Sequence, residues 1–198
     1  MEFNVMHCQN WLDNFTKTII EKKDYLNELD SPIGDGDHGS NMTRGVLEYR
    51  KLMETKPPQT ISDTLKLLAM AMISKVGGSS GPLYGTAFLA MSKVMDGVEK
   101  VTTLEEMSKI LTEGINGIQM RGKGVYEDKT MLDVWIPVVD HLKEGQLDST
   151  VIEQAKNNTA GFIAKKGRAS YLGERSIGHI DPGAASSAYL FEELFTII

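Results

Sequence analysis

The chain has 198 residues, of which 41% are hydrophobic and 24% are charged, as is ordinary for a folded globular protein. The net charge of -6 argues against nucleic acid as the main partner, because such binding depends on Lys and Arg neutralising phosphates. The single cysteine, Cys8, excludes an internal disulfide and a cysteine-based zinc cluster. The N-terminus is too polar for a signal peptide and no run of 18 apolar residues exists, so we expect a cytoplasmic protein that does not enter membranes.

Apolar residues recur at helical spacing almost throughout, and no alternating strand pattern is present. The pattern predicts an all-α single domain, residues 1–198, of about eight helices with short antiparallel connections. Residues 11–29, 42–53, 61–76, 83–98, 103–121, 130–144, 149–166 and 182–198 form the predicted helices. The fifth opens with a capping box at Thr103 and Glu106, the sixth is expected to bend at Pro137, and Gly167 is expected to cap the seventh.

In up-and-down packing, alternate loops share one end of the molecule. The loops after the first, third, fifth and seventh helices then form one rim, and these four loops hold the unusual residues. They comprise residues 30–41, Gly77-Gly78-Ser79-Ser80-Gly81, residues 121–131, and residues 168–183. Helix N-termini with unpaired N–H groups converge on the same rim, which favours a polyphosphate site. The opposite rim receives plain polar turns.

Three carboxylates, Asp30, Asp35 and Asp37, lie within eight residues. At about 4 Å and an effective dielectric near 20, each pair repels by roughly 4 kcal/mol, so a fold that gathers them requires a cation. Hard oxygen ligands on a short loop suit Mg²⁺, which completes its shell with substrate phosphates. Ser40 and Asn41 then open a helix whose free N–H groups are expected to attract phosphate. The loop therefore predicts a magnesium–nucleotide site.

Three familiar patterns match parts of these loops but fail on their surroundings. The glycines at 34, 36 and 39 have dinucleotide-fingerprint spacing, but a helix precedes them where that motif needs a strand. An EF-hand starting at Asp35 needs glycine at Ser40 and glutamate at Val46. The Gly77–Gly81 segment has the spacing of a hydrolase nucleophile elbow, but its preceding segment is helical.

Individual residues leave alternatives open. A single aspartate here is more often a cap or turn residue; three at this spacing favour metal ligands. His38 is a phosphate donor, a helix-terminal hydrogen-bond partner or, less in keeping with its acidic neighbours, a phosphoryl carrier. Arg168 suits bidentate phosphate binding. The role of His179 stays open between the site and loop packing, and that of Arg175 between the site and a surface charge.

Four long motifs resemble one family, the ADP-binding L subunits of the bacterial dihydroxyacetone kinases that use phosphoenolpyruvate through a phosphotransferase system. The matching segments are Asp30 with residues 34–39, residues 74–85, residues 128–135, and residues 167–176 with residues 181–183. They span essentially the whole chain.

The resemblance implies an eight-helix barrel with nucleotide at one rim and ADP or ATP retained as a coenzyme. It implies two Mg²⁺ ions on Asp30, Asp35 and Asp37, and Arg168 adding charge at the γ-phosphate. The nucleotide contacts that it implies are His38, Gly39, Ser40, Asn41, Ser79, Ser80, Gly122, Met131, Arg168, Asp181, Pro182 and Gly183.

The implied partners are a phosphohistidine donor subunit and a separate subunit that binds dihydroxyacetone, and we also expect a homodimer. Two alternatives remain. One is an ATP-dependent kinase domain of the same barrel, and the other is an ADP-sensing partner of a transcription regulator.

Overall fold

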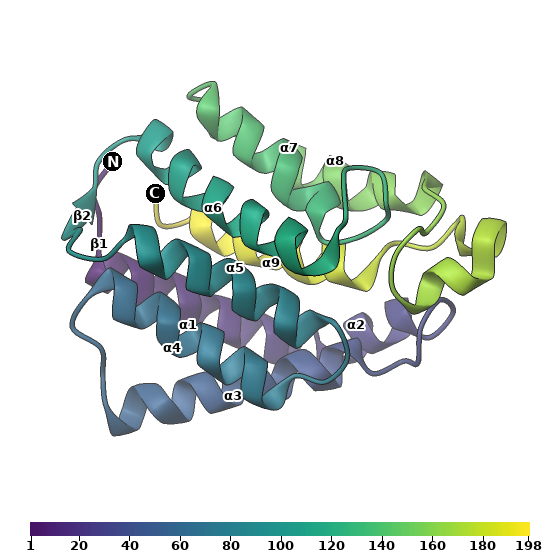
Figure 1. Ribbon diagram of the computed structural model, residues 1–198, viewed down its shortest axis with the longest axis horizontal. Coiled ribbons are helices and arrows are strands. Elements are labelled where there is room, and N and C mark those ends of the chain that lie inside the picture. Colours follow the sequence, from purple (N-terminus) through teal and green to yellow (C-terminus); the bar gives the residue numbers. More distant parts are fainter.

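The computed structural model describes residues 1–198, and helices account for nearly all of its regular structure (Figure 1). The α-helices are α1 (Val5–Glu21), α2 (Lys23–Asp30), α3 (His38–Thr55), α4 (Ile61–Lys75), α5 (Ser80–Val94), α6 (Leu104–Gly122), α7 (Leu132–Lys143), α8 (Thr150–Asn158) and α9 (Pro182–Phe195). Two 3-10 segments, η1 (Thr159–Gly161) and η2 (Arg168–Ser176), lie between α8 and α9. The all-α prediction is confirmed.

One small element has no signal in the sequence pattern. The strands β1 (Phe3–Asn4) and β2 (Lys100–Val101) pair antiparallel, with Phe3 opposite Val101. Two residues per strand are too few to produce a readable alternation. The ladder ties the N-terminus to the α5–α6 connection, at the end of the molecule opposite the unusual loops (Figure 1).

The helices form a ring in which successive helices pack side by side from α3 to α9, and α9 closes the ring by packing against α1. Their inward faces make one continuous cluster of 44 buried hydrophobic residues. Fully burying one large apolar side chain contributes about 1.5–3 kcal/mol, so such a core supplies the main driving force for the ring. Buried small residues from Ala184 to Ala188 let α9 approach its neighbours closely.

The first predicted helix is two helices, because the chain breaks direction at Lys22, where φ is -93° and ψ is 7°. The break lets α2 lean onto the start of α3. A Cβ on Gly39 would stand 1.9 Å from the carbonyl oxygen of Lys23, so only glycine permits this approach. The side chain of Asn27 then holds Ser40, accepting from its amide at 3.0 Å and donating to its hydroxyl at 3.0 Å.

The seventh predicted helix is also shorter than expected, since α8 ends at Asn158 and Gly167 caps no α-helix. Beyond η1 the backbone is extended at Phe162 and bonds to distant segments. The amide of Ala164 donates to Ser176 Oγ at 2.9 Å, and the amide of Lys165 donates to the Asp128 carbonyl at 3.0 Å. These long-range bonds replace the helical ladder that the periodicity predicted.

The predicted capping box is confirmed, since Thr103 and Glu106 form it at the start of α6. Pro137 lies inside α7. None of the helices is both long and apolar enough to cross a membrane.

Candidate functional site

The four unusual loops meet around one cavity of about 580 Å³, at the end where the loops around α2 and η2 lie (right side of Figure 1). The prediction that these loops share one rim is confirmed. The predicted site residues that line this cavity are Asp30, Asp35, Asp37, His38, Asn41, Ser79, Ser80, Gly122, Met131, Arg168, Asp181, Pro182 and Gly183. Gly39 and Ser40 lie outside the lining, where they pack against α2 instead.

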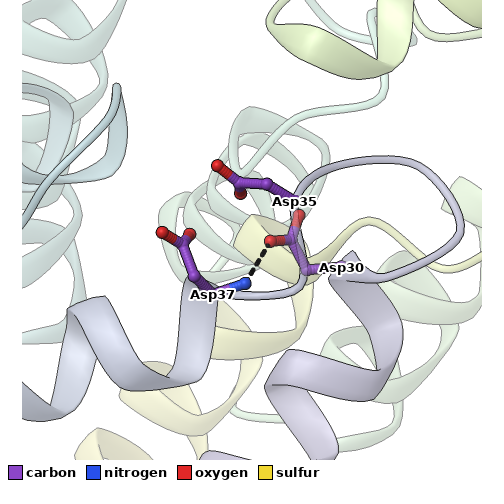
Figure 2. Close-up of side chains that lie close together, drawn as sticks. All are labelled: Asp30, Asp35 and Asp37. Atoms are coloured by element: carbon purple, nitrogen blue, oxygen red, sulfur yellow. Dashed lines mark hydrogen bonds between the residues drawn. The ribbon is translucent and has the colours of Figure 1, made fainter.

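Asp30, Asp35 and Asp37 come together at the end of α2 and in the loop before α3 (Figure 2). One carboxylate oxygen from each lies within 4.8 Å of the others. Burial, followed by the neighbouring carboxylates Asp35 and Asp30, raises the pKa of Asp37. The cluster offers hard oxygen ligands of the kind that Mg²⁺ prefers, so the donor set fits that ion.

The backbone of this loop is built around the Asp30 carboxylate. Asp30 Oδ2 accepts from the amides of Asp37, at 2.9 Å, and His38, at 3.2 Å, and the first of these bonds is drawn in Figure 2. A Cβ on Gly34 would stand 2.0 Å from Asp30 Oδ1, and Gly36 has a φ of +74°. Glycine is therefore required where the chain wraps this carboxylate.

The start of α3 differs from the expectation that its N–H groups are free. The amide of His38 bonds Asp30, that of Ser40 bonds Asn27 Oδ1 at 3.0 Å, and that of Asn41 bonds the Asp37 carbonyl at 2.8 Å. The expectation of a free donor is wrong at Ser40, because the close packing of α2 supplies its acceptor. In the first turn of α3, the His38 amide thus holds the aspartate loop and the Ser40 amide holds α2.

The Gly77–Gly81 loop, unlike the start of α3, has free backbone amides. None of its five amides has a hydrogen-bond partner within the protein, and no side chain caps the start of α5. A Cβ on Gly81 would stand 2.4 Å from the carbonyl oxygen of Val76, which fixes how tightly this turn is wound. A run of unpaired amides before a helix N-terminus is a strong anion-binding arrangement.

His38 is buried, with 6% of its surface exposed. Its Nε2 lies 2.9 Å from Ser186 Oγ and its Nδ1 lies 3.2 Å from Ser80 Oγ. Burial lowers the pKa of His38 to about 4, so the ring is neutral at physiological pH. Since both nitrogens already face serine hydroxyls, the geometry disfavours a phosphoryl-carrier role and leaves hydrogen-bonding roles.

Positive charge surrounds the carboxylates. Arg168 on η2 forms an ion pair with Asp35, with Nη1 and Oδ2 2.5 Å apart. Five basic residues line the cavity, namely Arg44, Arg121, Lys129, Lys166 and Arg168, of which Lys129 has a buried side chain. Positive side chains around a carboxylate cluster form an environment suited to a metal–polyphosphate complex.

Arg44 and Lys129 were not among the predicted site residues. Arg44 follows Asp37 and Asn41 at spacings that place all three on one face of α3, and Asn41 bonds both neighbours. This helical spacing is a signal that sequence reasoning can use.

Lys129 has no such local signal. It is 1% exposed, has a positive φ of 60°, and its Nζ donates to the carbonyls of Thr159 and His179. Asp133 braces the same loop by accepting from the amides of Glu127, at 2.5 Å, and Thr130, at 2.6 Å. Together these two buried charges fix the α6–α7 loop against the segment that precedes α9.

Asp181 caps α9, where its Oδ2 accepts from the amide of Ala184 at 2.8 Å. Burial raises the pKa of Asp181 to about 7. Met131 is 3% exposed and approaches Gly183, while Gly122 lies against Leu83. These residues give the cavity an apolar side, which suits a nucleotide base.

His179 and Arg175 lie outside the cavity lining. His179 takes part through its backbone carbonyl, which accepts from Lys129. Arg175 is exposed in η2 and makes no ion pair. Their positions disfavour ligand contact and favour loop packing for His179 and a surface charge for Arg175.

The DAK2 domain family matches residues 32–196. The chain belongs to this family. It is 50% identical, over 93% of its length and 92% of the relative, to a Listeria innocua protein named as the ADP-binding subunit of PEP-dependent dihydroxyacetone kinase 1. It is also 50% identical, over 95% of both chains, to the corresponding subunit of a PTS-dependent dihydroxyacetone kinase from Lactococcus lactis.

The fold is also found in a solved dihydroxyacetone kinase from C. freundii, with a TM-score of 0.75 and 23% identity. The match covers 98% of this chain and 34% of that longer chain. The same kinase is known in complex with AMP-PNP and Mg²⁺, where the TM-score is 0.72.

Proposed function

We propose that this protein is the nucleotide-binding subunit of a phosphoenolpyruvate-dependent dihydroxyacetone kinase. The observation that carries the proposal is one cavity lined by three clustered carboxylates and by four residues with unpaired amides, Gly77, Gly78, Ser79 and Ser80. Carboxylates alone repel phosphate and amides alone do not hold a metal. A metal–polyphosphate complex satisfies both.

The chain's own residues then have separable roles. Asp30, Asp35 and Asp37 would hold Mg²⁺, as two ions, and the metal would supply charge neutralisation for the phosphates. The Gly77–Gly81 amides and the Ser79 and Ser80 hydroxyls donate to phosphate oxygens. These groups position the phosphates and neutralise charge, which is most of what phosphoryl transfer asks of a protein.

The remaining predicted residues close the site around the nucleotide. Asn41, held by Asp37 and Arg44, faces the phosphates, and Gly39 and Ser40 act by holding the aspartate loop in place. Gly122, Met131, Pro182 and Gly183 contact the base and ribose, and Asp181 positions the start of α9. Arg168 releases Asp35 and moves its guanidinium to the γ-phosphate.

In the proposed reaction, a phosphohistidine on a donor subunit of the phosphotransferase system passes its phosphoryl group to bound ADP. The resulting ATP passes its γ-phosphoryl group to dihydroxyacetone on a separate kinase subunit, which gives dihydroxyacetone phosphate and restores ADP. The two cavity residues that could act as a base, His38 and Asp181, are already engaged in hydrogen bonds within the protein, which fits a substrate site on another subunit. We also propose a homodimer in the cytoplasm.

A chase experiment tests whether the nucleotide is a retained coenzyme. The protein is loaded with labelled ADP, turnover is started with phosphoenolpyruvate and the partner subunits, and excess unlabelled ADP is added. We expect the label to stay bound through many turnovers, because the site gives the phosphates many charge-assisted contacts. Loss of the label within a few turnovers would instead favour an exchanging, ATP-dependent kinase domain of the same fold.

A second candidate is an ADP-sensing partner of a transcription regulator, which would use the same cavity for binding alone. Turnover separates the two. An enzyme subunit supports phosphorylation of dihydroxyacetone from phosphoenolpyruvate when donor and substrate subunits are added, whereas a sensor binds ADP without supporting it. The enzyme is favoured because relatives 50% identical to this chain are named as subunits of dihydroxyacetone kinases.

A further inference from the structure

A buried chain of hydrogen-bonding side chains runs from the cavity into the helical ring. Its members, in order, are Ser80, His38, Ser186, Tyr84, Ser187 and Trp135. The five successive donor–acceptor distances are 3.2, 2.9, 2.8, 3.0 and 3.1 Å. Ser80, His38 and Tyr84 border the cavity, but Tyr84, Trp135, Ser186 and Ser187 are each 0% exposed. The inner part of the chain therefore has no access to water.

The inner end of the chain has a fixed direction. The indole of Trp135 can only donate, so Ser187 Oγ accepts from it. The side chain of Ser187 has only one other hydrogen-bond partner, Tyr84, so its proton goes to the Tyr84 hydroxyl. Tyr84 in turn donates to Ser186 Oγ. Because the indole N–H of Trp135 can only donate, it fixes the direction of the three hydrogen bonds from Trp135 to Ser186.

The hydroxyl of Ser186 has two possible acceptors, so the direction of the hydrogen bonds is not fixed beyond it. Having accepted from Tyr84, its hydroxyl can donate either to the Gly183 carbonyl, 3.1 Å away, or to His38 Nε2, 2.9 Å away. A neutral imidazole carries one proton, so this choice decides which nitrogen bears it. If Ser186 donates to Gly183, the ring is protonated at Nε2 and Ser80 donates to Nδ1. If Ser186 donates to Nε2, the ring is protonated at Nδ1 and donates to Ser80, whose own proton is free to point into the cavity.

We propose that His38 is a tautomeric switch that makes the Ser80 hydroxyl a donor to a bound phosphate. The inference rests on the proposed function, since it places a phosphate oxygen at Ser80. Both arrangements satisfy all six donors of the chain, so neither leaves a buried group unpaired. They differ only in the last acceptor, which is the Gly183 carbonyl in one and the phosphate in the other.

The nature of that last acceptor decides between them. A hydrogen bond to an ionised acceptor is roughly twice as strong as one between neutral groups. Phosphate therefore selects the arrangement with His38 protonated at Nδ1. One proton leaves Nε2 and one arrives at Nδ1 by exchange with water on the side of His38 that borders the cavity, where the residue is 6% exposed. The hydroxyls rotate, and the ring stays neutral. In the other arrangement the Ser80 hydroxyl donates to His38 Nδ1, so only its oxygen lone pairs face the phosphate.

Nitrogen NMR on the full chain with ¹⁵N-labelled histidine tests the switch at neutral pH. A His38→Gln variant identifies the His38 signals among those of the four histidines. We expect protonation at Nε2 in the nucleotide-free protein and at Nδ1 when the protein is saturated with Mg²⁺ and ADP. In Ser80→Ala the ring should stay protonated at Nε2 under both conditions, because the link to phosphate is gone.

Calorimetric titration of the same samples with ADP and Mg²⁺ separates failure of this inference from failure of the proposed function. We expect Ser80→Ala to bind about 10- to 100-fold more weakly, as for loss of a hydrogen bond to a charged group. No binding by the unmodified protein would overturn the proposed function and, with it, the inference. Binding with an unchanged His38 tautomer, or the same tautomer change in Ser80→Ala, would overturn the switch alone. A free protein already protonated at Nδ1 would also overturn it.

Discussion

The two ends of the helical ring treat glycine differently. At the cavity end, a Cβ would stand 2.0 Å from a neighbouring atom at Gly34, 1.9 Å at Gly39 and 2.4 Å at Gly81. At the opposite end, Gly97 and Gly145 also turn the chain, with φ near +74° and +73°, but nothing lies within 4 Å of a Cβ there. Glycine at the far end only permits a turn. At the cavity end Gly78 and Gly167 do the same, but Gly34, Gly39 and Gly81 also bring backbone and side chains into contact.

Backbone strain is distributed in the same way. The three non-glycine residues with positive φ are Lys123, Glu127 and Lys129, and all lie in the α6–α7 loop at the cavity end. Such conformations cost about 1–3 kcal/mol each and persist where surrounding contacts enforce them. The difference between the two ends shows that strained backbone, which lowers stability, is found at the end where it fixes the geometry of a site.

The largest expected effect comes from the carboxylates. Asp35→Ala or Asp37→Ala should lower phosphoryl transfer by about 10³-fold, or about 4 kcal/mol, because each removes a metal ligand. Helical content should stay unchanged, since neither carboxylate supports the core. Asp30→Ala should also lower stability by about 1–3 kcal/mol, because two amides lose their acceptor.

Asp96→Ala, an exposed aspartate at the opposite end, is the matched control and should leave both activity and stability unchanged. Coupled turnover assays and circular dichroism measure the two quantities. Near-normal activity in Asp35→Ala or Asp37→Ala would remove that residue from the ligand set.

A pair of glycine substitutions tests the contrast between the ends directly. Gly39→Ala should destabilise the protein by at least about 3 kcal/mol, because the new Cβ would collide with the Lys23 carbonyl. Gly145→Ala should cost only about 1 kcal/mol, from the positive φ alone. Urea unfolding measures both, and equal losses would show that the two ends are equally tolerant.

Acid should weaken the buried chain behind the cavity. The pKa of His38 falls from 6.5 to about 4 in the folded protein, so between these values the unfolded chain binds a proton that the folded chain does not. Stability therefore rises with pH through this window, and about 3 kcal/mol is lost on going from pH 6.5 down to about 4. His38→Gln should lack this part of the pH dependence. Identical pH profiles for the two proteins would contradict the assignment.

A smaller effect is expected at Lys129. Lys129→Met should cost about 1–2 kcal/mol, because the Thr159 and His179 carbonyls lose their donor while the penalty of burying a charge is relieved. Hydrogen exchange should become faster in residues 159–181 above all. Lys123→Met, an exposed lysine with positive φ in the same loop, is the control. Unchanged exchange in Lys129→Met would mean that this contact does not hold the loop.

Much of the fold and of the cavity could be predicted from the sequence, because the periodicity of the helices and the alternation of loops are local signals. The shared rim follows once the helices are placed. The break at Lys22 and the early end of α8 could not be predicted in this way. Both depend on partners distant in the chain, namely Gly39 against α2 and Asp128 with Ser176 against the segment after η1.

The site shows the same division. The three aspartates of the cluster lie within eight consecutive residues, so the cluster can be recognised from their spacing in the sequence. The roles of Lys129 and Ser186 depend on contacts with Thr159 and His38, which lie 30 and 148 residues away. From the sequence alone, the first amides of α3 are expected to be free donors, because the packing of α2 and Asn27 against them is not visible there. Sequence spacing thus finds ligands on one loop and misses the groups that hold the loops together.

The measurement that tests the central claim most directly is a calorimetric titration of the purified protein, first stripped of nucleotide and metal, with ADP in the presence and absence of Mg²⁺. The account predicts one ADP per chain, tight binding that requires Mg²⁺, and loss of most of that affinity in Asp37→Ala. Binding of ADP with equal strength in the presence of a chelator, or unchanged binding in Asp37→Ala, would contradict the claim that the clustered carboxylates and the Gly77–Gly81 amides form one metal–nucleotide site.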